Sequence, residues 1–161
     1  MLIILSADIF IPPLLLTARS SHVPTVLRTS AISLLSECAS TQPISLIRYL
    51  ENLSEGMVDL LQVESPKSHT TEEEDMNEDP ISKSSKLPPL RRAALHFLQV
   101  LIKESTLLLY ESPEQDALLS EAFLRRARIT LGYLASTDPD QVVRVMAREA
   151  EEAARQLQSG V

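Results

Sequence analysis

The chain has 161 residues, of which 44% are hydrophobic, enough to build the core of one domain or of a short repeat array. Aromatic residues make up only 4%, Trp is absent and there are 3 Gly, a composition that disfavours β-sandwiches and α/β nucleotide-binding folds. The formal net charge of −7 argues against a nucleic-acid-binding surface, because phosphate binding requires clustered Lys and Arg.

The apolar N-terminus is not typical of a signal peptide, because no basic region precedes it and Asp8, Pro12 and Pro13 interrupt the apolar run. No uninterrupted apolar run approaches the ~20 residues of a membrane-spanning helix. We expect residues 2–16 to form a core helix whose preceding N-terminal repeats belong to a longer parent chain. Without those repeats the helix would expose an apolar face and favour self-association.

Apolar residues at helical spacing predict six helices, at residues 8–19, 24–40, 43–62, 88–110, 117–135 and 139–158. In the second helix the expected buried stripe consists of Leu27, Ala31, Leu34, Leu35 and Cys38. Cys38 is the only cysteine, so no internal disulfide can form, and we expect its thiol to be buried filler rather than a nucleophile. Gly56, inside the third helix, either admits a close neighbour or is simply tolerated.

The last predicted helix begins after Asp138 as its N-cap, with Pro139 in the first turn. It is rich in Ala and in charged residues, as the polar terminal cap of a repeat array would be. Three ion pairs one helical turn apart are expected on the surface: Glu121 with Arg125, Arg148 with Glu152, and Glu151 with Arg155.

Composition divides the chain into helices in residues 1–63, an acidic linker in residues 64–86 and helices in residues 87–161. The linker is polar and nearly free of large apolar residues, so we expect it to be disordered. Thr70 and Thr71 each have Glu three residues later, which resembles an acidophilic-kinase site. Phosphate there would make the linker more negative and would repel or recruit a basic partner.

Three helix starts share one pattern: a turn that contains proline, an apolar residue, an arginine, and an alanine three residues after the arginine. The arginines are Arg28, Arg91 and Arg144. Arg28 and Arg91 are 63 residues apart, and removing the 23-residue acidic linker leaves 40, within the ~40–47 residues of a HEAT or armadillo repeat. The pattern predicts an all-α superhelix of stacked antiparallel helix pairs, with each arginine bonded to loop carbonyls or to an acidic residue of the adjacent repeat. An ordinary helical bundle is the alternative.

The segment Lys86–Leu98, KLPPLRRAALHFL, resembles the C-terminal conserved segment of the RNA polymerase II assembly and nuclear import factor family. Animal relatives in that family are named transport and Golgi organisation proteins. Val26–Glu37 and Gly56–Glu64 resemble the HEAT-like segment that precedes it. The resemblance covers about residues 10–135, and family members are much longer than this chain.

The resemblance implies a scaffold without catalytic residues or cofactors that shuttles between cytoplasm and nucleus. Its partners would be RNA polymerase II subunits and nuclear pore or assembly factors, with no direct contact to nucleic acid. A generic HEAT-repeat adaptor in vesicle traffic or Golgi organisation is the alternative function.

The residues themselves also disfavour an enzyme. None of His22, His69 and His96 has a metal-ligand partner at helical spacing, and Glu72–Asp75 lacks the spacing of a calcium loop. No Gly-rich phosphate loop or nucleophile elbow is present in the sequence. We expect partner proteins to contact an interleaved basic set on the otherwise acidic chain: Arg91, Arg92, Arg125, Arg126 and Arg128. The simpler interpretation of these arginines is a solvated helix surface.

Overall fold

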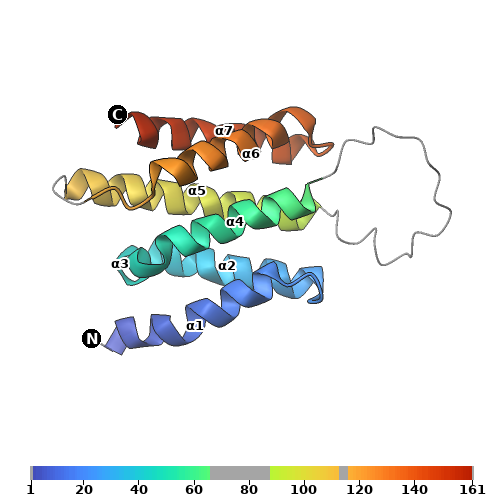
Figure 1. The fold of residues 1–161 in the computed structure, drawn as a ribbon. Coiled ribbons are helices and arrows are strands. Elements are labelled where there is room, and N and C mark those ends of the chain that lie inside the picture. Colours follow the sequence, from blue (N-terminus) through green and yellow to red (C-terminus); the bar gives the residue numbers. More distant parts are fainter. Residues whose placement is uncertain (1, 66–87, 113–115, 161) are drawn as a thin grey trace.

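A computed structural model describes residues 2–65, 88–112 and 116–160 of the chain, and within these ranges it is built from helices and short connections (Figure 1). The all-helical class predicted from the sequence is confirmed. The elements are α1 (Leu2–Arg19), α2 (Thr25–Thr41), α3 (Pro43–Leu46), the 3-10 helix η1 (Ile47–Tyr49), α4 (Leu50–Glu64), α5 (Pro88–Glu111), α6 (Glu121–Thr137) and α7 (Gln141–Ser159).

Several helix boundaries differ from those predicted. The first helix begins at Leu2, as expected for a helix over residues 2–16, and so extends the periodic stretch at 8–19 toward the N-terminus. The single helix expected over 43–62 is divided into α3, η1 and α4. The acidic linker was expected to start at residue 64, but Glu64 is the buried last residue of α4. The rest of that linker, residues 66–86 with Thr70 and Thr71, lies outside the described residues.

The start of α7 is a further correction. Its N-cap is Asp140, whose side chain accepts a hydrogen bond from the Val143 N–H at 2.9 Å, and not Asp138. Asp138 is instead the C-cap residue of α6 and is 1% exposed. It is unavailable as the N-cap because its carboxylate is turned inward to bind an arginine of another helix.

The long helices pair as three hairpins: hairpin 1 is α1–α2, hairpin 2 is α4–α5 and hairpin 3 is α6–α7. Consecutive hairpins pack against each other, because α2 contacts α5 and α5 contacts α7, while α1 contacts α4 and α4 contacts α6. The result is two layers, with the first helix of each hairpin in one layer and the second helix in the other. Figure 1 shows the two termini at opposite ends of this stack.

One apolar core runs through the stack and includes residues of all six long helices. The helices α1 and α4 lie close together at Gly56, where an added Cβ would lie 2.8 Å from the Leu15 Cδ1 of α1. Of the two interpretations of Gly56, the structure therefore supports a close neighbour. The alanines of the repeated helix start, Ala31, Ala94 and Ala147, are all buried, as their small size at a helix contact requires.

The repeated arginines connect one hairpin to the next. Arg28 donates from Nε to the Ala18 carbonyl of its own hairpin and from Nη1 to Glu64 of hairpin 2, both at 2.9 Å. Arg91 donates from Nε and Nη2 to Asp138 of hairpin 3, at 2.8 and 3.0 Å. Each acidic partner lies at the C-terminal end of the first helix of the following hairpin.

Arg144, in the third hairpin, donates from Nη1 to the Asp138 carbonyl at 2.7 Å and to the Pro139 carbonyl at 3.2 Å. The expectation that these arginines bond loop carbonyls or an acidic residue of the neighbouring hairpin is therefore confirmed.

Candidate protein-interaction surfaces

The five arginines expected to form a contact surface do not share one exposed surface. Arg91 is 1% exposed and its guanidinium lies between hairpins 2 and 3, against Asp138. Its burial corrects the expectation that it reaches a partner protein. Arg125 is the most exposed of the five, and it pairs at 3.1 Å with Glu121, as predicted from their spacing.

The other three arginines bridge helices at the edge of the stack. Arg92 donates from Nε to Asp140 at 3.2 Å and so joins α5 to the start of α7. Arg126 of α6 binds Glu55 and Asp59 of α4. These side chains are partly exposed, but their charges are already balanced within the chain.

Arg128 joins α6 to α7 in the same manner, with Glu151 at 3.0 Å and Gln158 at 2.9 Å. Glu151 also receives a bond from Arg155 at 2.9 Å, which confirms that predicted pair. The predicted pair of Arg148 and Glu152 is wrong, because Glu152 pairs with Arg155 instead, at 2.9 Å.

Hydrogen bonding holds the pKa of Asp140 below its ordinary value. The largest cause is the bond from Arg92, and the Val143 N–H at the first turn of α7 acts in the same direction. The pKa of Arg92 is raised, chiefly by the same bond. Both shifts favour the charged forms of the pair, whose hydrogen bonds join α5 to the start of α7.

Hairpin 1 carries large apolar side chains that are exposed. Leu16 of α1 is 72% exposed, and Leu27 and Leu34 of α2 are each 56% exposed. The sequence placed Leu27, Leu34 and Cys38 in the buried stripe of this helix, and that assignment is wrong. The stripe that is actually buried consists of Ala31, Ile32, Leu35 and Ala39, which lie to one side of the predicted one.

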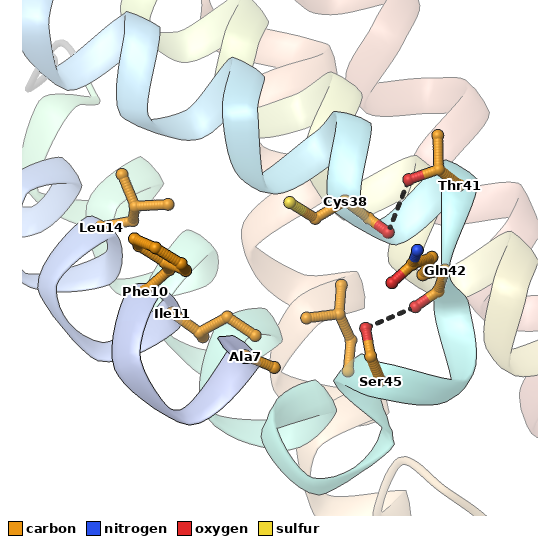
Figure 2. Close-up of a pocket in the computed structure, with 9 residues that line it drawn as sticks. Ala7, Phe10, Ile11, Leu14, Cys38, Thr41, Gln42 and Ser45 are labelled. Carbon is orange, nitrogen blue, oxygen red and sulfur yellow. Dashed lines mark hydrogen bonds between the residues drawn. The ribbon is translucent and has the colours of Figure 1, made fainter. Parts of the chain in front are cut away.

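A groove runs between α1 and the α2–α3 segment at this surface (Figure 2). Its volume is about 330 Å³, and its walls are Ala7, Phe10, Ile11, Leu14, Cys38, Thr41, Gln42, Ser45 and Leu46. In Figure 2 the Cys38 thiol points toward the α1 wall, where Phe10 and Leu14 lie. Cys38 is exposed, which corrects the expectation of a buried filler residue.

The polar side chains at the groove are engaged locally. Thr41 donates to the Glu37 carbonyl at 2.8 Å, and Ser45 donates to the Gln42 carbonyl at 2.7 Å. Apolar atoms therefore dominate what the groove offers a ligand, which suits an aliphatic or aromatic side chain of a partner better than a charged metabolite.

Two further findings concern only residues 2–65, 88–112 and 116–160. In these ranges no three His, Cys, Asp or Glu side chains gather closely enough to hold a metal ion. In the same ranges no helix has the length and apolar character to cross a membrane. His96 is exposed on α5.

Comparison with known proteins returned no matching family model, no matching curated protein and no matching solved structure.

Proposed function

We propose that the chain is a non-catalytic protein-binding scaffold, built as a HEAT/armadillo-type solenoid and acting in RNA polymerase II assembly and nuclear import. It is the C-terminal part of a longer factor that moves between cytoplasm and nucleus. The resemblance of Lys86–Leu98 and of the two HEAT-like segments supports the choice of process.

The observation that carries the scaffold proposal is the repeated bridge between hairpins. Arg28 and Arg91 occupy equivalent positions, and each binds a carboxylate at the end of the first helix of the next hairpin. A single recurring contact between neighbours is what a linear stack of like units requires. An ordinary helical bundle does not require the same bridge between each hairpin and the next.

A stack of this kind has a long surface relative to its core, and solenoids use that surface to bind other proteins. In this chain the exposed apolar surface of hairpin 1, around Leu16, Leu27 and Leu34, is of the kind that marks protein contact sites. The net charge of −7 favours partners with basic surfaces over nucleic acid.

Binding of the purified chain to individually purified RNA polymerase II subunits, measured by biolayer interferometry, tests the proposal. Saturable binding to at least one subunit is expected. Substituting Arg125→Glu tests the most exposed of the arginines without touching the buried Arg91 or the bridge between Arg128 and Glu151. If that variant binds unchanged, Arg125 is excluded as the contact.

A second experiment tests the proposed role in nuclear import by locating the chain in cells. A fluorescently tagged chain should be found in both cytoplasm and nucleus. Lack of saturable binding to every subunit, together with confinement of the tagged chain to Golgi membranes, would replace the proposal with that of an adaptor in vesicle traffic.

A further inference from the structure

Aligning α2, α5 and α7 on Arg28, Arg91 and Arg144 defines two sets of equivalent positions. We name the first set the front positions: Leu27, Leu34 and Cys38 in α2, Leu90, Phe97 and Leu101 in α5, and Val143, Ala150 and Ala154 in α7. We name the second set the back positions: Ile32, Leu35 and Ala39 in α2, Leu95, Leu98 and Ile102 in α5, and Arg148, Glu151 and Arg155 in α7.

Burial of the two sets follows which neighbours each helix has. The middle helix α5 packs between α2 and α7, and all of its front and back residues are buried. In α7, which follows α5, the front residues are buried, whereas Arg148 and Arg155 at the back are exposed. In α2, which precedes α5, the back residues are buried, whereas the front residues are exposed.

This pattern indicates which neighbouring hairpin covers each set of positions. Front positions are covered by the preceding hairpin, and back positions by the following one. The exposed leucines of α2 therefore occupy the positions that the same repeat buries against a preceding neighbour in hairpins 2 and 3. The groove beside Cys38 extends this surface onto α1, where Phe10 is 61% exposed.

The two ends of the stack differ in chemistry. At the back of α7, Glu151 is bound by Arg128 and Arg155, which makes this end a charged cap. An apolar surface cannot dock there without burying these charges, which is costly. The front of hairpin 1 is apolar, so only that end is suited to a further apolar contact.

We infer that the front of hairpin 1 is a docking surface for one further helical hairpin of this repeat type, whose second helix presents aliphatic residues at its back positions. The helices α2 and α5 show the required spacing of i, i+3 and i+7, as Ile32, Leu35 and Ala39 and as Leu95, Leu98 and Ile102. The incoming hairpin needs no bridging arginine, because residues 19–23 contain no carboxylate equivalent to Glu64 or Asp138. The inference rests on the repeat architecture in the proposed function, but not on the identity of the polymerase partner.

The test introduces aliphatic residues at the three back positions of α7 in the full chain. Substituting Arg148→Leu, Glu151→Leu and Arg155→Ile converts the charged back of α7 into the stripe seen on α2 and α5. One molecule can then dock its α7 on the front of hairpin 1 of another. Sedimentation velocity should show the graft shifting from the monomer mass of 17.9 kDa to a concentration-dependent series of multiples. The unmodified chain should stay monomeric, in contrast to the self-association expected from its apolar first helix, because the charged back of α7 does not complement the apolar front of hairpin 1.

Two companion variants make the result specific. Adding Leu27→Glu and Leu34→Glu to the graft should return it to the monomer, because charge at the exposed front positions prevents docking. A control variant, E149L/E152L/Q156L, places three leucines at the same spacing on another exposed side of α7 and should stay monomeric. Circular dichroism of every variant should match that of the unmodified chain.

Three results would overturn the inference: a graft that remains monomeric, oligomers that persist with both glutamates present, or a control that oligomerises equally. Dimerisation of the unmodified chain that the two glutamates abolish would also overturn it, by showing that a second copy occupies the front surface. Binding to RNA polymerase II subunits is measured in a separate experiment. A chain that binds no subunit would therefore contradict the proposed function without affecting the oligomerisation result.

Discussion

Replacing Asp138 by Asn tests the buried bridge between hairpins 2 and 3. The side chains of Asp138 and Arg91 are 0% and 1% exposed, and two bonds of 2.8 and 3.0 Å join them. Asn keeps the shape of Asp and can still accept the bond that the Asp140 N–H makes to Asp138 Oδ1 at 2.9 Å. The substitution therefore removes the negative charge and one of the two bonds from Arg91, because the Asn amide nitrogen cannot accept from the Arg91 Nε–H.

The expected cost is large because the Arg91 charge loses its Asp138 counterion inside the protein. Removing one partner of a buried ion pair typically costs about 3–5 kcal/mol. Domains of this size have total stabilities of about 5–15 kcal/mol. For a chain of this length the loss corresponds to a fall in Tm of roughly 6–20 °C.

Urea denaturation followed by circular dichroism measures this loss in a cycle of four proteins: the unmodified chain, D138N, R91M and the double variant. The double variant removes both charges, so its loss should be smaller than the sum of the single losses by about 1–3 kcal/mol. The exposed pair of Glu121 and Arg125 supplies a control, because E121Q should cost less than about 0.5 kcal/mol.

Two outcomes would refute the reasoning. A loss below about 1 kcal/mol in D138N would mean that water or another group balances the Arg91 charge. Additive single losses would mean that the two residues do not act as a pair.

Three further predictions use simpler measurements. Gly132→Ala should raise the free energy of unfolding by roughly 0.5–1 kcal/mol in the same assay, because its Cβ would meet no atom within 4 Å; a lower urea midpoint would contradict this. Cys38 should react with Ellman's reagent in the native chain within about tenfold of its rate in urea, because it is exposed, and strong protection would count against the fold near α2. Bonds from Arg155 and then Arg128 hold the pKa of Glu151 below its ordinary 4.5, so this carboxylate stabilises the fold above that pH and the contribution is lost as pH falls through the lowered pKa. E151Q should therefore be less stable than the unmodified chain at about pH 7, and the difference should shrink as pH falls below 4.5 and through the lowered pKa; a difference independent of pH would exclude the ion pairs as its cause.

Local signals predicted much of the fold. The apolar spacing that predicts helices and the proline-bearing turns act over a few residues, so neighbouring sequence is sufficient to recognise them. The bridging role of Arg28 was also predictable, because an arginine at a helix contact must find carbonyls or carboxylates. The sequence assigned Arg91 both to such a bridge and to a partner surface, and only its burial decided between them. Finding the partners of both arginines, Glu64 and Asp138, required the packing of hairpins far apart in the sequence.

The interaction surface was much less predictable. The sequence itself determined that α2 is a helix with more apolar residues than one neighbour can cover. Only the tertiary structure decided that Ile32 and Leu35 are buried while Leu27 and Leu34 are exposed. Likewise, Asp138 has the residue type of an N-cap, and the approach of Arg91 decided that it forms an ion pair. The physical reason is that helix formation depends on contacts within one turn, whereas burial depends on which other helix lies alongside.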